Sequence, residues 1–269
     1  MKQRITGLAL AAAAALSLAG PVTPAFAQQA QSRLYDITKA GKLRVCTWPL
    51  YYSISFRNPS TGQLEGIDAD LMKELAKDMG VQLEVVDTAF GTFIADLQAN
   101  KCDIGMFGVG ATMKRAQAVE FSKPYLVTNV YAVIKADGPI KQWSDIDKTG
   151  MTAVVTLGSY IEPFMRGYLK NATLNAVSPP ATSQAELMSN RADVIMSDFP
   201  TAIRMKKEFD GVTFLLPTEK LAVTPYAYVV APGDQIWLNY VNLFVDTIKL
   251  DGRLAKAAEK NGLTPIVAP

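Results

Sequence analysis

The sequence predicts an α/β protein with parallel sheets. Short strands rich in Val and Ile alternate with segments of helical periodicity over most of the chain, which is the pattern of βαβ units. A second group of such elements, beginning near residue 131, has a layout similar to that of the first group. The length of 269 residues allows one or two domains of about 100 to 200 residues each.

The first group opens with a strand at 43–46, which an aromatic loop joins to a helix predicted over 69–79. Leu71 and Leu75 fall on one face of this helix. Gly80 follows it directly and is the residue type that favours the left-handed conformation after a helix. The remaining elements of the group are a strand at 82–86, a helix at 90–100 and a strand at 102–107.

The second group contains predicted strands at 131–134, 152–156 and 193–197, a helix ending near 169 and a short helix near 184–189. A strand at 212–216, a strand at 227–230 and closing helices at 235–249 and 252–261 follow it. No linker rich in Pro, Gly or Ser separates the groups, so ordered crossings near 127–131 and 219–226 must join them. A lobe inserted in this way places a cleft at the strand ends, where open α/β sheets bind ligands. The expected organisation is a signal peptide at 1–27, a first lobe at 28–128, a second lobe at 129–222 and a return to the first lobe at 223–269.

The first 27 residues have the order of a secretory signal peptide. Lys2 and Arg4 precede a long Ala/Leu run that ends in Ala25-Phe26-Ala27, and we expect cleavage after Ala27. No Cys lies nearby to carry a lipid anchor, and no later stretch reaches the roughly 18 apolar residues of a spanning helix. We therefore expect a soluble, exported protein.

The charge of the exported part argues against two classes of partner. Two of the 27 basic residues precede residue 28 and all 25 acidic residues follow it, so the remainder carries 25 of each. Nucleic acid and anionic membranes both favour a basic surplus. We expect neither as a partner, and the neutral composition is compatible with a monomer.

Cys46 and Cys102 are the two cysteines of the chain. A disulfide is the first expectation in an exported protein. However, Cys46 ends one predicted strand and Cys102 begins another, so parallel strands would separate them by about 13 Å. Because a disulfide needs alpha carbons within roughly 7 Å, the sequence predicts two buried thiols.

A candidate anion site follows the strand at 102–107. Gly108 and Gly110 leave backbone N–H groups open to a ligand, and Thr112 and Arg115 follow at once. A guanidinium aimed at the same point can hold a carboxylate through two hydrogen bonds.

The order of these motifs resembles the periplasmic solute-binding proteins of amino-acid ABC importers, known as solute-binding family 3, over nearly the whole exported chain. The matching pieces are Leu43-Arg44-Val45, Tyr51, Phe56-Arg57-Asn58, Gly66 to Leu71, Phe90, Leu97, Cys102-Asp103, Thr112 to Arg115, Phe121 to Tyr125, Asp193 and Asp198. The resemblance implies a two-lobed periplasmic-binding-protein fold of type II, in which each lobe is a sheet flanked by helices and the ligand cleft lies between the lobes. It also implies a membrane permease as partner and a small carboxylate-bearing ligand, first of all an amino acid.

The resemblance implies that Arg115 holds the ligand's α-carboxylate and that Asp198 pairs with its α-ammonium. Arg115 could instead be a surface residue at a helix start, and Asp198 could be the N-cap of the helix that follows it. Gly108 and Gly110 stand where most amino-acid binders have Ser or Thr. Carboxylate binding by backbone N–H groups is therefore retained, while recognition of an amino group is weakened.

Two further groups are candidates for the pocket. Ser159 can add a second hold on the carboxylate or cap its helix, and Tyr160, where the family often has a small hydroxyl residue, narrows the pocket or forms an aromatic wall. Trp48, Tyr51 and Phe90 are the other expected walls. Core packing is the alternative for Phe90, and Tyr52 is the alternative to Tyr51.

The sequence favours a binding protein over an enzyme, with no cofactor and no metal. The chain has no His, which removes the Ser/His/Asp triad and the commonest general base. Asp68 is interpreted as an N-cap without chemistry. The enzymatic alternative is an exported cyclohexadienyl dehydratase, which uses the same fold and would need an acid such as Glu162, although the helix dipole explains that residue more simply. A binder of a non-amino-acid organic acid is the other alternative.

Overall fold

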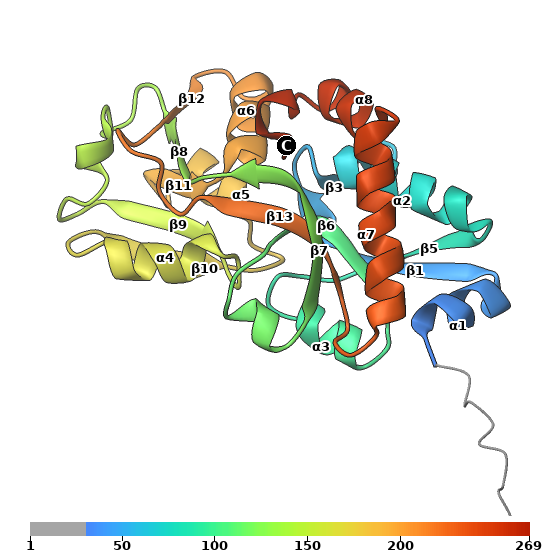
Figure 1. Cartoon of the computed structure of the whole chain (residues 1–269). Coiled ribbons are helices and arrows are strands. Elements are labelled where there is room, and N and C mark those ends of the chain that lie inside the picture. The colour runs from blue at the N-terminus through green and yellow to red at the C-terminus, as the bar shows by residue number, and fades with distance from the viewer. Residues whose placement is uncertain (1–30) are drawn as a thin grey trace, which may run out of the picture. The chain divides into compact units, whose positions relative to one another are not determined.

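The structure of the chain, a computed structural model, describes residues 31–269; the predicted signal peptide lies outside them. A five-stranded sheet, the first sheet, forms one part of the molecule (Figure 1). Its strands in spatial order are β5 (Gln82–Asp87), β1 (Lys42–Thr47), β6 (Ile104–Gly110), β13 (Thr224–Val230) and β7 (Glu120–Thr128). Strand β6 is buried along its whole length.

The second sheet also has five strands. They are, in spatial order, β10 (Thr173–Val177), β9 (Thr152–Thr156), β11 (Val194–Ser197), β8 (Tyr131–Lys135) and β12 (Val212–Leu215). A small third sheet, β2 (Leu50–Tyr51), β3 (Ser55–Arg57) and β4 (Leu64–Glu65), folds the aromatic loop that follows β1.

Both large sheets are mixed, so the expectation of parallel sheets is correct for only part of each. Strand β1 runs parallel to β5 and β6, whereas β13 runs antiparallel to both of its neighbours. In the second sheet, β9 runs parallel to β10 and β11, and β8 runs antiparallel to β11 and β12. The antiparallel strands β8 and β13 each follow a passage from one sheet to the other.

Eight α-helices are described within residues 31–269: α1 (Arg33–Ala40), α2 (Ile67–Met79), α3 (Phe93–Gln98), α4 (Ile161–Tyr168), α5 (Ser183–Met188), α6 (Phe199–Glu208), α7 (Gln235–Leu250) and α8 (Arg253–Lys260). Short 3-10 helices lie at Arg115–Gln117, Trp143–Asp145 and Thr264–Ile266. Gly80 ends α2 in the left-handed conformation, with a φ of 66°, as predicted. None of the helices in the described part of the chain is long and apolar enough to cross a membrane.

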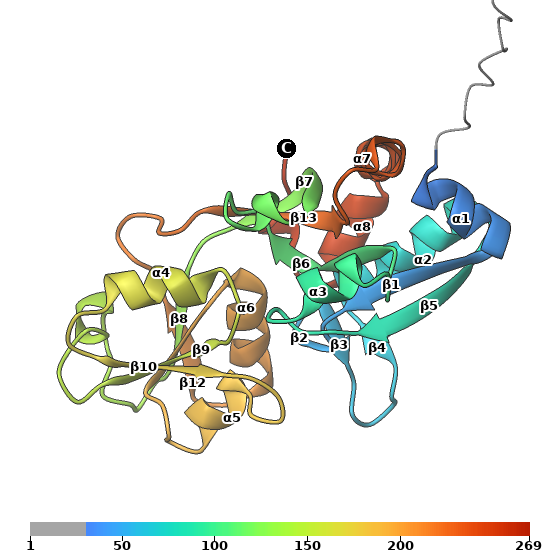
Figure 2. The same cartoon turned by 90° about the horizontal axis from the view of Figure 1, so that it is seen from below.

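The helices cover the two sheets separately. Helices α2 and α3 pack against strands of the first sheet and α7 packs against β7, while α4, α5 and α6 pack around the second sheet (Figure 2). The chain passes from the first sheet to the second between β7 and β8, and it returns between β12 and β13. We call each large sheet with the helices packed on it a lobe, and we count the third sheet, which packs on α2, as part of the first lobe.

The prediction of two free thiols is wrong, because Cys46 and Cys102 form a disulfide with alpha carbons 5.5 Å apart. The predicted separation assumed that Cys102 begins an extended strand. Strand β6 starts only at Ile104, and Cys102 lies in the bend before it. The backbone N–H of Asp103 donates to the carbonyl of Arg44 at 2.8 Å, which holds this bend against β1.

Candidate functional site

A cavity of about 30 Å³ lies between side chains of the two lobes. Six of the nine predicted ligand-binding residues line it: Trp48, Tyr51, Phe90, Ser159, Tyr160 and Asp198. The other lining residues are Leu50, Thr156, Ile161, Ser183, Gln184, Ile195, Met196, Ser197 and Thr201. Most of the polar residues in this set come from the second lobe, and the aromatic wall comes mainly from the first.

Asp198 connects the lobes. Strand β11 ends at Ser197, and Asp198 then caps α6, accepting from the backbone N–H of Thr201 at 3.1 Å. The predicted N-cap is therefore confirmed. The other carboxylate oxygen accepts hydrogen bonds from the hydroxyls of Tyr51 and Tyr226, which belong to the first lobe. Asp198 is 2 % exposed, so its carboxylate oxygens are hydrogen-bonded by these protein donors and not by bulk water.

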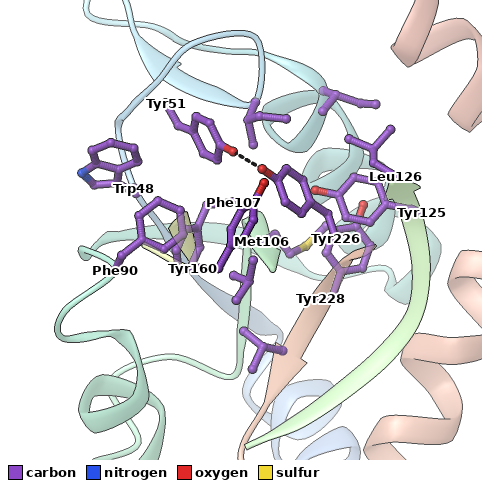
Figure 3. Packing of buried hydrophobic residues seen from close by; sticks show 14 of the residues in the cluster. Trp48, Tyr51, Phe90, Met106, Phe107, Tyr125, Leu126, Tyr160, Tyr226 and Tyr228 are labelled. Atoms are coloured by element: carbon purple, nitrogen blue, oxygen red, sulfur yellow. Dashed lines mark hydrogen bonds between the residues drawn. The ribbon is translucent and has the colours of Figure 1, made fainter. Parts of the chain in front are cut away.

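The hydroxyls of Tyr51 and Tyr226 lie 2.8 Å apart and point toward each other (Figure 3). Burial and the negative charge of Asp198 raise the pKa of both hydroxyls well above 10. Both tyrosines therefore remain protonated donors at neutral pH. The sequence did not single out Tyr226, because β13 has the pattern of a core strand; its position beside the crossing at 219–226 was the available signal.

Arg115 also reaches across the cleft. It lies in the 3-10 helix that follows β6, and it is 9 % exposed, so the surface alternative is wrong. Its guanidinium donates to the carbonyl of Gly110 at 2.8 Å and to that of Gly158, in the second lobe, at 2.9 Å. Burial lowers the pKa of Arg115 to about 10, so the side chain is still a cation at neutral pH.

Arg115 is not among the described residues that line the cavity. Its guanidinium lies 5.6 Å from the ring centre of Phe90, which does line it, and 5.4 Å from the ring centre of Phe93. These distances are within reach of a cation–π interaction. The charge therefore lies directly behind the aromatic wall.

Gly108 and Gly110 make room for aromatic rings. Gly108 has a φ of +63°, and a Cβ there would lie 2.8 Å from Cε1 of Tyr51. A Cβ on Gly110 would lie 3.0 Å from Cδ1 of Tyr160. The space that we expected a ligand to use next to these glycines is thus filled by the rings of Tyr51 and Tyr160.

Ser159 and Glu162 together close the start of α4. The Ser159 hydroxyl accepts from the backbone N–H of Glu162 at 3.3 Å, and the Glu162 carboxylate accepts from the backbone N–H of Gly158 at 2.6 Å. Glu162 also pairs with Arg166 at 2.8 Å. Both residues therefore stabilise the helix terminus, although Ser159 also lines the cavity.

Trp48, Tyr51 and Phe90 form one aromatic wall, with ring centres 5.1 to 5.8 Å apart (Figure 3). Tyr52 packs instead on Phe56, with ring centres 4.6 Å apart, and does not line the cavity among the described residues. Tyr51 is therefore the tyrosine of this pair that faces the cavity.

Asp68 is not the N-cap of α2, which is Gly66. It lies in the first turn and is fully buried, where one carboxylate oxygen accepts from the Gly108 backbone N–H at 2.8 Å and from the Tyr125 hydroxyl at 2.6 Å. Burial raises the pKa of Asp68 to about 7. The helix starts two residues earlier than predicted, and this places the side chain under the turn at Gly108.

Comparison with known proteins identifies the family of the chain. The sequence profile of the bacterial extracellular solute-binding proteins, family 3, matches residues 43–264. The chain is 27% identical over 247 residues to a cyclohexadienyl dehydratase of Pseudomonas aeruginosa, covering 91% of each sequence. It is 25% identical over 245 residues to the L-cystine-binding protein TcyJ of Escherichia coli, covering 90% of each.

A solved structure shares the fold. The crystal structure of the ancestral amino acid-binding protein AncCDT-1, a precursor of cyclohexadienyl dehydratase, matches with a TM-score of 0.77 and 34% identity, over 86% of this chain and 99% of that one. The predicted two-lobed fold of type II periplasmic binding proteins is thereby confirmed. The profile match and the shared architecture show that the chain belongs to the bacterial extracellular solute-binding proteins, family 3.

Proposed function

We propose that this protein is the exported substrate-binding component of an ABC importer, which captures a small carboxylate-bearing solute by closing its lobes. The observation that carries the proposal is the buried Arg115 guanidinium, which already bridges the lobes by donating to the carbonyls of Gly110 and Gly158. Lobes that rotate about their connecting strands and close on a ligand are a common binding device.

A carboxylate suits Arg115 better than its present partners do. The guanidinium has five N–H donors in a planar fork, and two of them are directed at neutral carbonyl oxygens. A carboxylate that enters the cleft would replace the Gly158 contact with a charge-assisted, two-point interaction, which is roughly twice as strong. Ligand binding would thus exchange one bridge between the lobes for a stronger one.

Amino acids are the first ligands to test. The relatives include a protein described as amino acid-binding and one described as cystine-binding. Asp198 is the acidic side chain of the cavity lining and the partner available to an α-ammonium. In that mode, the ammonium would displace the hydroxyl of Tyr51 or Tyr226 from Asp198.

A thermal-shift screen of the exported form against the common amino acids and small dicarboxylic, oxo and hydroxy acids tests the function. A ligand that binds only the native state raises the melting temperature by mass action. We expect at least one carboxylate to do so in the wild type and not in Arg115→Ala. If every carboxylate leaves the melting temperature unchanged, while uncharged solutes raise it, the proposal is wrong.

Dehydratase activity is the second candidate, favoured by the similarity to the Pseudomonas aeruginosa enzyme over 91% of the chain. The acid considered for it, Glu162, is engaged by Gly158 and Arg166 and does not line the cavity among the described residues. Turnover assays with prephenate and arogenate distinguish an enzyme from a binder. Product formation that Glu162→Gln abolishes would establish the enzymatic function.

The partner and the location belong to the same proposal. A permease in the membrane would recognise the closed form, and the protein would act as a periplasmic monomer. Light scattering of the purified protein tests the monomer, and ligand-dependent stimulation of ATP hydrolysis by a reconstituted transporter tests the partner.

A further inference from the structure

The acid of the cavity has no free capacity to accept hydrogen bonds. A carboxylate accepts about four. One oxygen of Asp198 accepts from the Thr201 backbone N–H at 3.1 Å and from the Ser197 hydroxyl at 3.4 Å. The other accepts from the hydroxyls of Tyr51 and Tyr226. An ammonium group can reach Asp198 only if it displaces a protein donor.

The cavity holds buried donors whose partners are not supplied by the protein. Trp48 and Tyr160 line the cavity and are 8 % and 9 % exposed. The indole N–H of Trp48 has no hydrogen-bond partner within residues 31–269. The hydroxyl of Tyr160 makes no hydrogen bond of normal geometry there either, but it lies close enough to the Tyr226 hydroxyl for that group to lower its pKa against the larger effect of burial. An indole N–H can only donate, and leaving a buried donor unpaired is unfavourable. A ligand that places a hydrogen-bond acceptor beside these groups would pair them.

The glycines at the end of β6 offer no side-chain acceptor to an ammonium either. Gly108 and Gly110 have no side-chain oxygen, and the rings of Tyr51 and Tyr160 fill the space beside them. Tyr51 and Tyr226 remain protonated because burial and Asp198 raise their pKa. Thr156, Ser183 and Gln184 also line the cavity and can accept as well as donate hydrogen bonds. The Trp48 N–H, which can only donate, and the occupied oxygens of Asp198 favour an acceptor on the ligand.

We infer that the ligand is a small carboxylate whose second polar group accepts hydrogen bonds, a 2-oxo acid, and that the 2-amino acid of the same skeleton binds more weakly. This inference rests on the proposed function. The ligand carboxylate binds Arg115, and its oxo oxygen accepts from Trp48 or Tyr160. Asp198 serves to hold Tyr51 and Tyr226 and does not serve as the receptor of an ammonium.

Calorimetry with matched pairs tests the inference on the full exported protein. The pairs are pyruvate with L-alanine, 4-methyl-2-oxopentanoate with L-leucine, and phenylpyruvate with L-phenylalanine. In the pair that binds most tightly, we expect the oxo acid to have a Kd at least about tenfold lower, because it pairs donors that the amino acid leaves unpaired. Equal affinities, or tighter binding of the amino acid, would overturn the inference and leave the proposed function standing. If no carboxylate of any kind binds, both are wrong.

Variants separate the roles of the donors. Tyr51→Phe/Tyr226→Phe keeps both rings but frees an oxygen of Asp198, so the preference for the oxo acid should fall by about tenfold. Trp48→Phe keeps the aromatic wall and removes the indole donor, so it should weaken oxo-acid binding more than amino-acid binding. Tyr35→Phe, at a 45 % exposed position on α1, is the control for loss of a phenol.

An unchanged ratio of affinities in the double variant would contradict the role given to Asp198. If the double variant does not fold, Tyr226→Phe alone provides the same test, and the matched pairs on the wild type require no substitution.

Discussion

Tyr51 donates a hydrogen bond to Asp198, which lies 147 residues further along the chain and in the other lobe. Tyr226 donates to the same oxygen, and Arg115 joins the lobes a second time through the carbonyl of Gly158. Hydrogen bonds contribute about 0.5 to 1.5 kcal/mol each, and about 1.5 to 3 kcal/mol when one partner is charged. Closure therefore depends on a small number of polar contacts, which a ligand can replace.

Arg115→Ala should weaken binding of the tightest carboxylate by at least about 2 kcal/mol, since it removes a buried partner of the ligand's charge. Isothermal calorimetry measures the change. Lys114→Ala is the matched control, because it removes the same charge from the neighbouring, exposed position. The assignment of Arg115 to the ligand fails if the two variants bind alike.

Gly108→Ala should destabilise the protein more than Gly62→Ala. Both glycines have a positive φ, +63° and +69°, which costs an L-residue about 1 to 2 kcal/mol. A Cβ at position 108 also meets the ring of Tyr51 at 2.8 Å, whereas position 62 is open. We expect the substitution at position 108 to lower the free energy of unfolding by about 1 to 3 kcal/mol more than the substitution at position 62, as measured by urea unfolding. Equal losses would show that Tyr51 does not pack there.

Asp68→Asn should flatten the pH dependence of stability. Burial raises the pKa of Asp68 from 3.8 to about 7, so the folded state holds this proton more tightly than the unfolded state does. The stabilisation of the folded state by this proton is therefore fully present below pH 4 and is lost as the pH rises through 7.

Between pH 5 and pH 8, the free energy of unfolding of the wild type should fall by roughly 1 to 3 kcal/mol more than that of the variant. Urea titrations at both pH values measure this. Asp70→Asn is the control. Asp70 lies on α2, as Asp68 does, and pairs with Lys260 at the surface, so this variant should show the same decrease in the free energy of unfolding as the wild type. A wild type and an Asp68→Asn variant with parallel profiles would refute the assignment.

Reduction should destabilise the first lobe. The disulfide joins residues separated by 56 positions, and the chain-entropy relation gives about 4 kcal/mol for a loop of this length. Urea unfolding with and without dithiothreitol, and of Cys46→Ser/Cys102→Ser, should show the same loss. Two titratable thiols in the unreduced, denatured protein would show that the bond does not form.

The elements that the sequence predicted well are those with uniform burial. The strand at Thr152–Thr156 was predicted with its correct bounds, because a run of β-branched residues lies in the middle of a sheet. Strand β10 was missed because it is short and none of its residues is fully buried, although its first four residues alternate between exposed and half-buried. Strand β13 starts three residues before its predicted start. The start was predicted too late because Pro225, near the beginning of the strand, is a residue type that is uncommon within strands.

The sequence identified those side chains of the site whose residue type itself indicates a binding role. It missed those whose role depends on how the chain packs. Arg115 and Asp198 stand out as charges next to strand ends. From the sequence, Tyr226 has the pattern of a core residue, and only the register of β13 shows that it faces the site. Asp68 has the pattern of an N-cap, and only the observed start of α2 shows that it is not one. The disulfide was missed because a bend of two residues before β6 cannot be read from the spacing of the cysteines.

Strand β7 is the edge of the first sheet, and its one neighbour there is β13, which is made much later in the chain. The strands of the second sheet all lie between residues 131 and 215, so the second lobe can complete its hydrogen bonding before β13 is synthesised. The backbone of β7 must wait unpaired until β13 arrives. An exposed edge strand is a site of aggregation, so the nascent chain is most vulnerable just before its C-terminal segment is released.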